Sequence, residues 1–477
     1  MSEPRGLYIG GVWRRTKDER NVINPYDGSV VGRACVGGEK NVLDAIAAAR
    51  DGFAVTKNYS SGERSELCFR IASGIAAKKE AFAKTIAMEA GKPISQARRE
   101  VDRAIATFTI AAEEAKRIGG EGVPIDLDPA SKGYAAFVGR FPIGPVAAIS
   151  PFNFPLNLVA HKVAPALACG CAVVHKPAGK TPLTAVLLAE TIDEAGAPPG
   201  AYNLAICEKP AAELLATDPR LAMLTFTGSA GVGWRLKEIA GRKKVALELG
   251  GNAGAFVGAD ADLPWAAKRC AQGAYAFAGQ ICISVQRVYA DRAIFDEFVR
   301  LFLEEASKLR AGNPMDGNTF LGPLIDEESA DRVMSWVDEA VRGGAKLLLG
   351  GARNGNVIDP ILLTGVDPKA KVSAGEVFGP VAVVEPCDGP ADGIARIDDS
   401  RFGLQAAVFT HDIRTIREAY RAIEAGGLIV NDYPTFRADN YPYGGVKESG
   451  TGREGVRYAI EELTEPRTLV INFNHGL

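Results

Sequence analysis

Histidine and cysteine are scarce in this sequence, with four and eight copies among 477 residues. Eight cysteines in so long a chain are too sparse for a disulfide framework. Cys169 and Cys171 form a C-x-C pair, but no second pair or histidine follows at the spacing of a zinc site. We therefore expect free thiols, no metal centre and a reducing compartment.

Long apolar runs and basic blocks are also missing. The most apolar segment, 163–174, is bracketed by Lys162 and His175 and is too short to cross a bilayer. The 55 basic and 58 acidic residues give a net charge of −3, without a basic block that would suit nucleic acid. The first residues, MSEPRGLYIGGVWRR, lack the apolar core of a secretory signal. The sequence predicts a cytoplasmic protein without membrane or nucleic-acid partners.

Strand-like and helix-like segments alternate along most of the chain, which is typical of parallel α/β layers. A hydrophobic content of 47% with 24% charged residues favours a globular protein, and 477 residues favour two or three domains. Residues 60–118 have the pattern of two long helices, and the alternation restarts after Gly251. We predict the α/β class, with two parallel α/β lobes that meet near residue 250.

A β-rich segment near the end of the chain, TEPRTLVINF, has no obvious partner strand close to it in the sequence. Such a terminal strand often pairs across a subunit interface. We expect it to combine with residues 123–141 into a small β bridging element. The predicted boundaries are 1–122 and 142–250 for the first lobe, 251–446 for the second, and 123–141 with 466–477 for bridging and oligomerisation.

Short motifs raise a question about Cys282, which lies between two isoleucines in the stretch GQICIS. A free cysteine is by default a buried core residue. Six motifs nevertheless follow one another along the chain: PFNFP with Asn153, KPAGKTP with Lys176, FTGS with Ser229, LELGG with Glu248, GQIC with Cys282, and GEVFGP with Glu376. Together they resemble the aldehyde dehydrogenase superfamily over essentially the whole chain, in particular its lactaldehyde or semialdehyde-type, NAD(P)-dependent branch.

The resemblance implies oxidation of an aldehyde to a carboxylic acid, with NAD or NADP as cofactor. Cys282 would be the nucleophile that forms a thiohemiacetal and then a thioester. Asn153 and the Cys282 backbone N–H would stabilise the oxyanion, and Glu248 would activate the water that hydrolyses the thioester. Considered alone, Asn153 could be a helix N-cap and Glu248 a solvated strand end.

The resemblance also implies a dinucleotide-binding first lobe and a catalytic second lobe. No G-x-G-x-x-G follows a first strand. The resemblance implies that the pyrophosphate instead meets the start of the helix after FTGS, against Gly228 and Ser229, where free N–H groups favour anions. Lys176 resembles the family residue at the adenosine ribose, and Glu376 resembles the one at the nicotinamide ribose, with Phe378 nearby. The other expected cofactor contacts are Ile149, Ser150, Pro151, Phe152, Ala178, Gly179, Lys180, Glu248, Leu249, Gly250 and Cys282.

One departure from the family pattern concerns the choice of cofactor. Relatives that prefer NAD usually carry a glutamate three residues after the Lys176 position, where this sequence has Gly179 followed by Lys180. The loss of a carboxylate reduces repulsion of a 2′-phosphate, and lysines could pair with that phosphate. The sequence therefore predicts that NADP is accepted, and it leaves NAD use open.

Polar residues on one predicted helix face and two arginines indicate the substrate class. Asn153, Asn157 and His161 repeat every four residues and so share one face. His161 could equally be a buried core histidine. Arg103 and Arg437 stand where relatives bind anionic aldehydes or close the substrate mouth, although either could form a structural ion pair. The pattern favours a small polar or anionic aldehyde.

Two isoleucines beside the predicted nucleophile, Ile281 and Ile283, are also expected to touch the substrate. Some phosphate-binding relatives carry an arginine at the position of Ile281, so the isoleucine weakens the case for a phosphorylated aldehyde. Lactaldehyde-, sulfolactaldehyde- and semialdehyde-like substrates stay open. The alternatives are a CoA-acylating semialdehyde dehydrogenase and a catalytically silent dehydrogenase fold that only binds. We expect a homodimer or a homotetramer.

Overall fold

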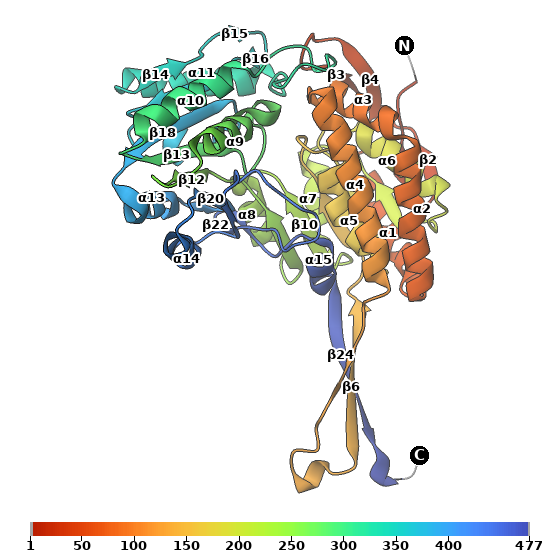
Figure 1. The fold of residues 1–477 in the computed structure, drawn as a ribbon. Coiled ribbons are helices and arrows are strands. Elements are labelled where there is room, and N and C mark those ends of the chain that lie inside the picture. Colours follow the sequence, from red (N-terminus) through yellow and green to blue (C-terminus); the bar gives the residue numbers. More distant parts are fainter. Residues whose placement is uncertain (1–2, 476–477) are drawn as a thin grey trace.

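Two α/β lobes and a projecting arm make up the computed structural model, which describes residues 3–475 (Figure 1). The ends of the predicted first lobe and of the predicted bridging element, residues 1–2 and 476–477, lie outside the described residues. Each lobe is built on one large sheet, of eight strands in the first and seven in the second. The prediction of an α/β fold with two parallel lobes is confirmed.

The first sheet has five parallel strands at its centre and short antiparallel strands at both edges. From one edge to the other it contains β2 (Val12–Arg14), β1 (Leu7–Ile9), β9 (Tyr202–Leu204), β8 (Val173–Lys176), β7 (Val146–Ile149), β10 (Met223–Thr227), β11 (Lys244–Glu248) and β23 (Gly450–Thr451). A hairpin of β3 (Glu19–Ile23) and β4 (Val30–Cys35) lies outside this sheet. All four residues of β7 are buried, as expected for a central parallel strand covered on both faces.

Helices cover the first sheet, and several of them carry residues of the predicted site. They are α1 (Glu39–Thr56), α2 (Ser61–Ala77), α3 (Lys79–Ala90), α4 (Ile94–Ala115), α5 (Asn157–Cys169), α6 (Leu183–Glu194), α7 (Lys209–Thr217), α8 (Ala230–Ile239) and α15 (Val456–Glu462). Helix α5 is buried along its whole length and packs against α4, α2 and α15. Its polar residues therefore lie inside the lobe, where each needs a partner.

The region 60–118 differs from the sequence prediction of two long helices, because it contains three. The first predicted helix is interrupted at Lys78, whose backbone (φ −101°, ψ 16°) leaves the helical region and ends α2. Helix α3 starts at the next residue and buries Phe82 and Ile86. It ends at Gly91, which adopts the left-handed conformation (φ 68°) that glycine tolerates best.

Only four residues, 249–252, separate the end of β11 in the first lobe from the first strand of the second sheet, which starts at Ala253. Its strands are β14 (Lys346–Leu349), β17 (Ile361–Thr364), β18 (Val381–Cys387), β13 (Val285–Asp291), β12 (Ala253–Val257), β20 (Gln405–Phe409) and β21 (Gly427–Val430), with β14 antiparallel and the others parallel. The helices are α9 (Leu263–Tyr275), α10 (Phe295–Ser307), α11 (Glu327–Arg342), α12 (Lys371–Ala374), α13 (Gly389–Asp398) and α14 (Ile413–Ala422). Two-residue strands form the ribbons β15 (Arg353–Asn354) with β16 (Val357–Ile358) and β19 (Phe402–Gly403) with β22 (Val446–Lys447).

The arm is a three-stranded antiparallel sheet that extends away from both lobes (Figure 1). Strand β6 (Tyr134–Pro142) is central, with β5 (Glu121–Val123) on one side and β24 (Thr464–Asn472) on the other. β24 pairs with β6 over nine residues, from Thr464 opposite Pro142 to Asn472 opposite Tyr134. The terminal strand therefore finds its partner within the same chain.

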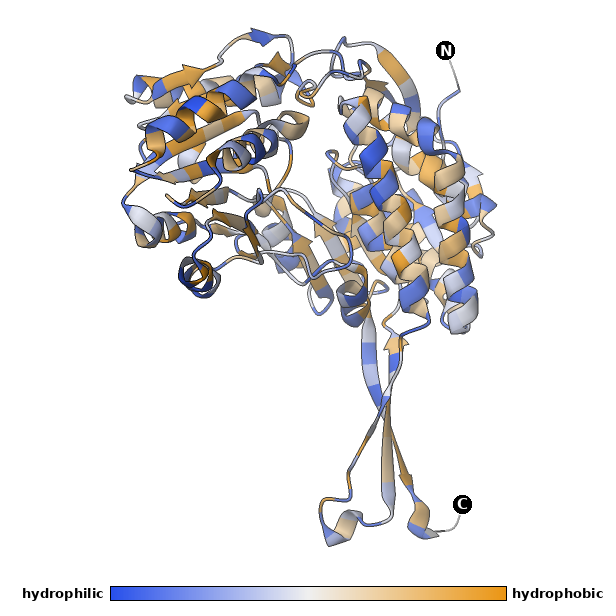
Figure 2. Ribbon diagram, in the orientation of Figure 1, coloured by the Kyte–Doolittle hydropathy of each residue, from blue (hydrophilic) through white to orange (hydrophobic). Residues whose placement is uncertain are grey.

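Hydrophobic residues gather on the strands inside each lobe, whereas most helices carry both polar and apolar residues (Figure 2). The first lobe has one large core that contains β7, β8, α4 and α5. The second lobe has two main clusters, one around α9 and α10 and another around α11. Within residues 3–475, no helix is long and apolar enough to cross a membrane.

Candidate active site

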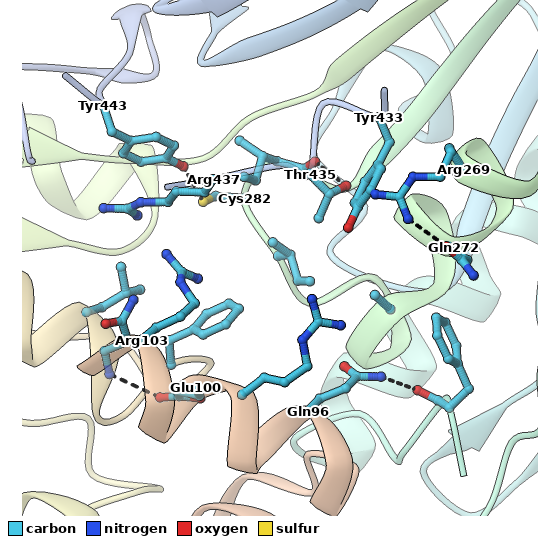
Figure 3. Close-up of a pocket in the computed structure, with 18 residues that line it drawn as sticks. Gln96, Glu100, Arg103, Arg269, Gln272, Cys282, Tyr433, Thr435, Arg437 and Tyr443 are labelled. Carbon is cyan, nitrogen blue, oxygen red and sulfur yellow. Dashed lines mark hydrogen bonds between the residues drawn. The ribbon is translucent and has the colours of Figure 1, made fainter. Parts of the chain in front are cut away.

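A cavity of about 280 Å³ contains the thiol of Cys282 in its wall (Figure 3). Its walls come from helices α4 and α5 of the first lobe, from α9 and the loop after it in the second, and from the segment 433–443. The lining residues are Gln96, Arg99, Glu100, Arg103, Phe154, Asn157, Leu158, Arg269, Gln272, Ala276, Ile281, Cys282, Ile283, Phe320, Tyr433, Thr435, Arg437 and Tyr443. Six predicted residues, Arg103, Asn157, Ile281, Cys282, Ile283 and Arg437, thus face one space.

The backbone before Cys282 is held in an uncommon conformation. Phe277 (φ 49°), Ala278 (φ 51°) and Gly279 (φ 70°) are successive residues in the left-handed region, which costs the first two about 1 kcal/mol or more each. The side chain of Gln280 secures this turn: its Nε2 donates to the carbonyl oxygens of Phe277 and Pro323, both at 3.3 Å, and its Oε1 accepts from the Ile325 N–H at 2.9 Å. The loop that carries the thiol is therefore fixed before any ligand arrives.

The Cys282 thiol lies 3.1 Å from the hydroxyl of Tyr443. Ile281, Ile283 and Leu404 belong to the same hydrophobic cluster as the thiol, and Arg437 lines the same cavity. Burial raises the pKa of Cys282 to about 11, although the hydrogen bond from Tyr443 and the charge of Arg437 act in the opposite direction. At neutral pH the thiol therefore keeps its proton.

Asn153 contacts the cysteine loop from the first lobe. Its Nδ2 donates to the Gln280 carbonyl oxygen at 2.9 Å, which leaves the second hydrogen of the amide for another acceptor. Asn153 does not cap helix α5: Leu156 is the N-cap, and the buried carboxylate of Glu100 accepts from the N–H groups of Leu156 and Asn157 at 2.9 and 3.2 Å. Asn153 itself does not line the thiol cavity, and its Oδ1 has no hydrogen-bond partner within residues 3–475.

Glu248 ends strand β11 in a buried position and does not line the thiol cavity. It borders a separate cavity of about 20 Å³ together with Lys162 and Glu454. Within residues 3–475 its Oε2 has no hydrogen-bond partner. Burial, and next the negative charge of Glu454, raise the pKa of Glu248 well above its usual value. The carboxylate thus has a high affinity for a proton.

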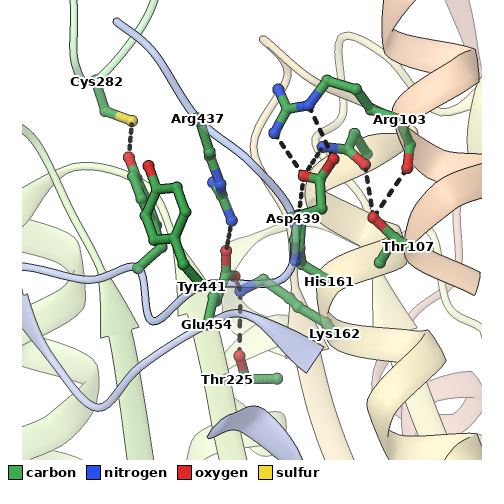
Figure 4. Close-up of polar contacts among 12 residues, drawn as sticks. Arg103, Thr107, His161, Lys162, Thr225, Cys282, Arg437, Asp439, Tyr441 and Glu454 are labelled. Atoms are coloured by element: carbon green, nitrogen blue, oxygen red, sulfur yellow. Dashed lines mark hydrogen bonds and ion pairs between the residues drawn. The ribbon is translucent and has the colours of Figure 1, made fainter. Parts of the chain in front are cut away.

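A first polar network is centred on the buried carboxylate of Asp439 (Figure 4). Arg103 donates to it through Nη2 at 2.6 Å and Nε at 3.2 Å, and His161 Nε2 lies 2.8 Å from it. Asn157 is 3.4 Å away through Nδ2 and also accepts from Thr107. Burial opposes ionisation, but His161 and then Arg103 together lower the pKa of Asp439. His161 is buried in this network and does not line the thiol cavity.

A second network is centred on the buried carboxylate of Glu454 (Figure 4). Arg437 Nη2 donates to it at 2.8 Å, and Lys162 Nζ lies 3.1 Å from it and also donates to Thr225 at 3.1 Å. Although burial opposes ionisation, Lys162 and Arg437 lower the pKa of Glu454 to about 2. The guanidinium of Arg437 lies over the ring of Tyr443, 3.7 Å from its centroid.

The predicted cofactor residues gather at the carboxyl ends of the first lobe's parallel strands. Ile149, Lys176 and Thr227 end β7, β8 and β10, and Glu248 ends β11 beside Thr227. Because β8 and β10 flank β7 on opposite sides, the strand order reverses at β7, which is where open α/β sheets form a ligand crevice. Ser229 is the N-cap of α8, and its side chain makes no capping hydrogen bond.

Glu376, the candidate for the nicotinamide ribose, lies against two glycines. Glu376 Oε1 accepts from the Gly251 N–H at 3.0 Å, and a Cβ on Gly250 would come within 2.3 Å of the same carboxylate. Burial raises the pKa of Glu376 to about 7. Beside it, the rings of Phe152 and Phe378 meet edge to face, with centroids 5.9 Å apart. Glu376 and Ser229 line one cavity of about 610 Å³, which joins the start of α8 to the second lobe.

Gly179 lies in another cavity, of about 490 Å³, with Arg20 and Lys180. A Cβ on Gly179 would come within 2.2 Å of Arg20 Nη1, so the guanidinium of Arg20 occupies the space of the missing side chain. Arg20 forms an ion pair with Glu208, and Lys180 forms one with Asp326. Lys176 is largely buried, and burial lowers its pKa.

Several residues of these sites belong to none of the motifs identified in the sequence. Tyr443 contacts Cys282 across 161 residues, and Asp439 contacts His161 across 278. Glu454 contacts Lys162 across 292 residues and the predicted Arg437 across 17. Arg99 lies one turn before Arg103 on helix α4, and that spacing is a signal that could have been used. Among the described residues, no group of three or more histidine, cysteine or acidic side chains could hold a metal ion.

Residues 13–469 match the Aldehyde dehydrogenase family, and the chain belongs to this family. A 3-sulfolactaldehyde dehydrogenase from Priestia megaterium is 46% identical over 470 residues, which cover 98% of both chains. Aldehyde dehydrogenase 21 from Physcomitrella patens, solved in complex with the reaction product succinate, has a TM-score of 0.97 with 39% identity and full coverage of both chains. Glyceraldehyde-3-phosphate dehydrogenase GapN from Methanocaldococcus jannaschii, complexed with NADP, has a TM-score of 0.92 with 40% identity and covers 96% of this chain and 100% of its own. The family resemblance predicted from the motifs is confirmed.

Proposed function

We propose that this protein oxidises a small anionic aldehyde to a carboxylic acid, with Cys282 as nucleophile and NADP or NAD as cofactor. The observation that carries the proposal is the cavity around the thiol, whose wall contains four arginines, Arg99, Arg103, Arg269 and Arg437. Positive charge in a partly enclosed cavity attracts and orients anions. The relatives named for sulfolactaldehyde and crystallised with succinate support an anionic substrate.

The four arginines differ in how much of their charge is already matched. Arg103 pairs with Asp439, Arg269 pairs with Asp432 at 2.6 Å, and Arg437 pairs with Glu454. Arg99 has no carboxylate partner within residues 3–475. It shares the cavity-facing side of α4 with Gln96 and Arg103, as positions three and four residues apart do. We therefore assign the main contact with the substrate's anionic group to Arg99.

In the proposed reaction, the sulfur of Cys282 attacks the aldehyde carbon after the thiol has lost its proton. The carbonyl oxygen becomes negative and accepts hydrogen bonds from Asn153 Nδ2 and the Cys282 N–H. Loss of hydride from this carbon, for which bound NAD(P) would supply the acceptor, leaves a thioester on Cys282. We assign to Glu248 the removal of a proton from the water that hydrolyses the thioester, because its charge acts on the Cys282 thiol although it lies outside the cavity of that thiol.

The first experiment measures kcat/KM for 4-oxobutanoate and for butanal, which have the same chain length but differ in charge. We expect the anionic aldehyde to be preferred by about 10-fold or more, the value of one charge-assisted hydrogen bond. Cys282→Ser should lose activity by about 10³-fold or more. Equal use of both aldehydes would contradict the anionic substrate, and an active serine variant would contradict the nucleophile.

Arg99→Gln tests the assignment of the anion contact. It should lower kcat/KM for 4-oxobutanoate by about 10-fold and change the value for butanal by less than about 2-fold. Arg98→Gln is the matched control, because the neighbouring Arg98 faces away from the cavity and pairs with Glu80. If Arg103→Gln, and not Arg99→Gln, discriminates between the two aldehydes, the anion is bound through the Asp439 network instead.

The environment of Gly179 supports acceptance of NADP. The guanidinium of Arg20, together with Lys176 and Lys180, surrounds the position where a glutamate would repel a 2′-phosphate. Glu208 is the carboxylate that Arg20 would exchange for this phosphate. The free helix N-terminus at Ser229 and the glycines beside Glu376 likewise suit a dinucleotide.

Cofactor binding can be followed without catalysis, because Trp234 and Trp336 line the cavity that contains Ser229 and Glu376. We expect tryptophan fluorescence to respond to NADP and NAD. Arg20→Gln should raise Kd for NADP by about 10-fold and leave Kd for NAD within about 2-fold. An unchanged Kd for NADP would contradict the role of Arg20 but not the proposed reaction.

We also propose that residues 1–122 and 142–250 form the dinucleotide-binding domain, 251–446 the catalytic domain, and 123–141 with 466–477 an oligomerisation element. The arm supports the last assignment, because it leaves apolar side chains such as Phe137, Leu469 and Val470 at least half exposed. A homodimer or homotetramer would cover them. The proposed location is the cytoplasm, where the eight free thiols would stay reduced.

A further inference from the structure

We propose that Tyr443 is a positioning residue that holds the sulfur of Cys282 and stabilises its thiolate, and that Arg437 acts on the sulfur through Tyr443. The inference rests on the proposed role of Cys282 as nucleophile. It gives Arg437 a part different from the substrate contact that the sequence suggested.

The first observation is the position of the Tyr443 hydroxyl. It lies 3.1 Å from Sγ of Cys282, and no other hydrogen-bond partner of this sulfur is found within residues 3–475. Tyr443 is only 3% exposed and packs with Ile283 and Leu404. In such an apolar setting a sulfur anion is costly to form, so one hydrogen-bond donor has a large effect on it.

The direction of the hydrogen bond follows from the burial of both groups. Burial, and next the neighbouring Cys282, raise the pKa of Tyr443 well above its usual value, so the phenol keeps its hydrogen. When the thiol loses its proton to water, the phenol O–H can donate to the sulfur anion. A protonated thiol receives less benefit from the same contact, and the phenol therefore favours ionisation.

Arg437 holds Tyr443 in place from its other side. The backbone N–H of Tyr443 donates to the Glu454 carbonyl at 3.0 Å, and the Glu454 N–H donates back at 2.6 Å. The Glu454 side chain binds Arg437, whose guanidinium covers the Tyr443 ring. Each of the three residues, Tyr443, Glu454 and Arg437, thus contacts the other two.

The Arg437 side chain is only 6% exposed, and its charge is matched by Glu454. A guanidinium that is buried and already paired with a carboxylate contributes little to the binding of a substrate anion. Over an aromatic face, however, it is attracted to the ring and makes the phenol a stronger donor. The geometry therefore favours an action on the nucleophile over a contact with the substrate.

Alkylation of the full-length protein by iodoacetamide tests the proposal, because the reaction consumes the thiolate and needs no aldehyde or cofactor. Mass spectrometry of the peptide that contains Cys282 gives the rate between pH 7 and pH 10. The other seven cysteines are buried and serve as an internal measure of folding. Tyr443→Phe removes only the hydroxyl.

We expect Tyr443→Phe to slow alkylation of Cys282 at pH 8 by about 10-fold, which corresponds to about one pH unit in the titration of the thiol. Tyr441→Phe is the matched control: Tyr441 belongs to the same cluster, but its hydroxyl contacts Gln405 and the Phe436 carbonyl. Arg437→Gln should slow alkylation in the same direction, whereas Arg437→Gln in the Tyr443→Phe background should have a smaller effect.

A wild-type alkylation rate and pH profile in folded Tyr443→Phe would overturn the proposal. If alkylation were unchanged and aldehyde oxidation still fell, Tyr443 would act on the substrate and the inference would be wrong, while the proposed reaction would stand. An active Cys282→Ser variant would instead remove the proposed function, whatever the alkylation rates show.

Discussion

Two regions that meet at one small cavity hold buried glutamates with opposite proton affinities. At the end of β11, Glu248 has an unpartnered Oε2 and a raised pKa. On the loop before α15, Glu454 binds Lys162 and Arg437, and its pKa is lowered to about 2. The chemistry of the two side chains is identical, so the difference comes from their contacts. Lys162 and Arg437 bind Glu454 directly. They act on Glu248 only through their charge, and burial and the charge of Glu454 outweigh them there.

The comparison teaches which of the two carboxylates can take part in proton transfer. A carboxylate that is ionised at every physiological pH balances charge but is a poor base, whereas one with a raised pKa accepts a proton readily near neutral pH. Two neighbouring groups whose environments push their pKa values apart are typical of acid–base sites. Glu454 therefore fits a structural role, and Glu248 fits a chemical one.

The largest expected effect is on turnover. Glu248→Gln should lower kcat by about 10²- to 10⁴-fold, because a general base contributes that much. Reduced cofactor should still form once per active site, and an acyl-enzyme should accumulate that intact-mass measurement detects. Glu462→Gln, at the same cavity, is the control and should retain its rate. An undiminished steady-state rate in Glu248→Gln would mean that another group activates water, and rescue by coenzyme A would favour an acylating enzyme.

The next effect is on stability. Glu454→Gln leaves Lys162 and Arg437 buried without their counter-charge, which should lower the free energy of unfolding by about 3–5 kcal/mol. Urea denaturation followed by circular dichroism measures the shift in midpoint. Glu248→Gln should not lower the midpoint. If both variants lost stability equally, the two glutamates would not differ in the way that their contacts indicate.

The smallest expected effect is on how the stability of the protein depends on pH through these two glutamates. Because the folded pKa of Glu454 lies below its usual 4.5, its contribution is complete above that pH and is lost as the pH falls through about 2. The folded pKa of Glu248 is raised, so its ionisation destabilises the fold increasingly as the pH rises above 4.5. Glu248→Gln should therefore gain Tm relative to wild type by about 2 °C more at pH 8 than at pH 5. Calorimetry at pH 5 and pH 8 measures Tm. The same Tm difference between Glu248→Gln and wild type at both pH values would contradict this prediction.

Much of the fold could be predicted from the sequence because its signals are local. Alternating strand and helix patterns indicate parallel sheets, and the change of sheet between Glu248 and Ala253 follows the pattern near residue 250. The interruption at Lys78 was missed, because no proline or glycine marks it and the apolar spacing continues across it. Short two-residue strands such as β23 carry no pattern at all.

The candidate site likewise contains residues that the sequence reveals and residues that only the structure reveals. Asn153, Glu248 and Cys282 stand in recognisable motifs, so the sequence alone selects them. No motif marks Tyr443, which contacts Cys282, or Glu454, which binds Lys162. The residues of each pair are more than 150 positions apart in the sequence. Sequence also cannot tell a free guanidinium from a paired one, which is why Arg99 was overlooked while Arg103 and Arg437 were selected.

The raised pKa of Cys282 has a consequence for the resistance of its thiol to oxidation between turnovers. Peroxide attacks the thiolate, not the thiol, and a pKa of about 11 keeps the anionic fraction small at neutral pH. The remaining seven cysteines are buried. We therefore expect hydrogen peroxide to inactivate the protein slowly at pH 7 and faster as the pH rises.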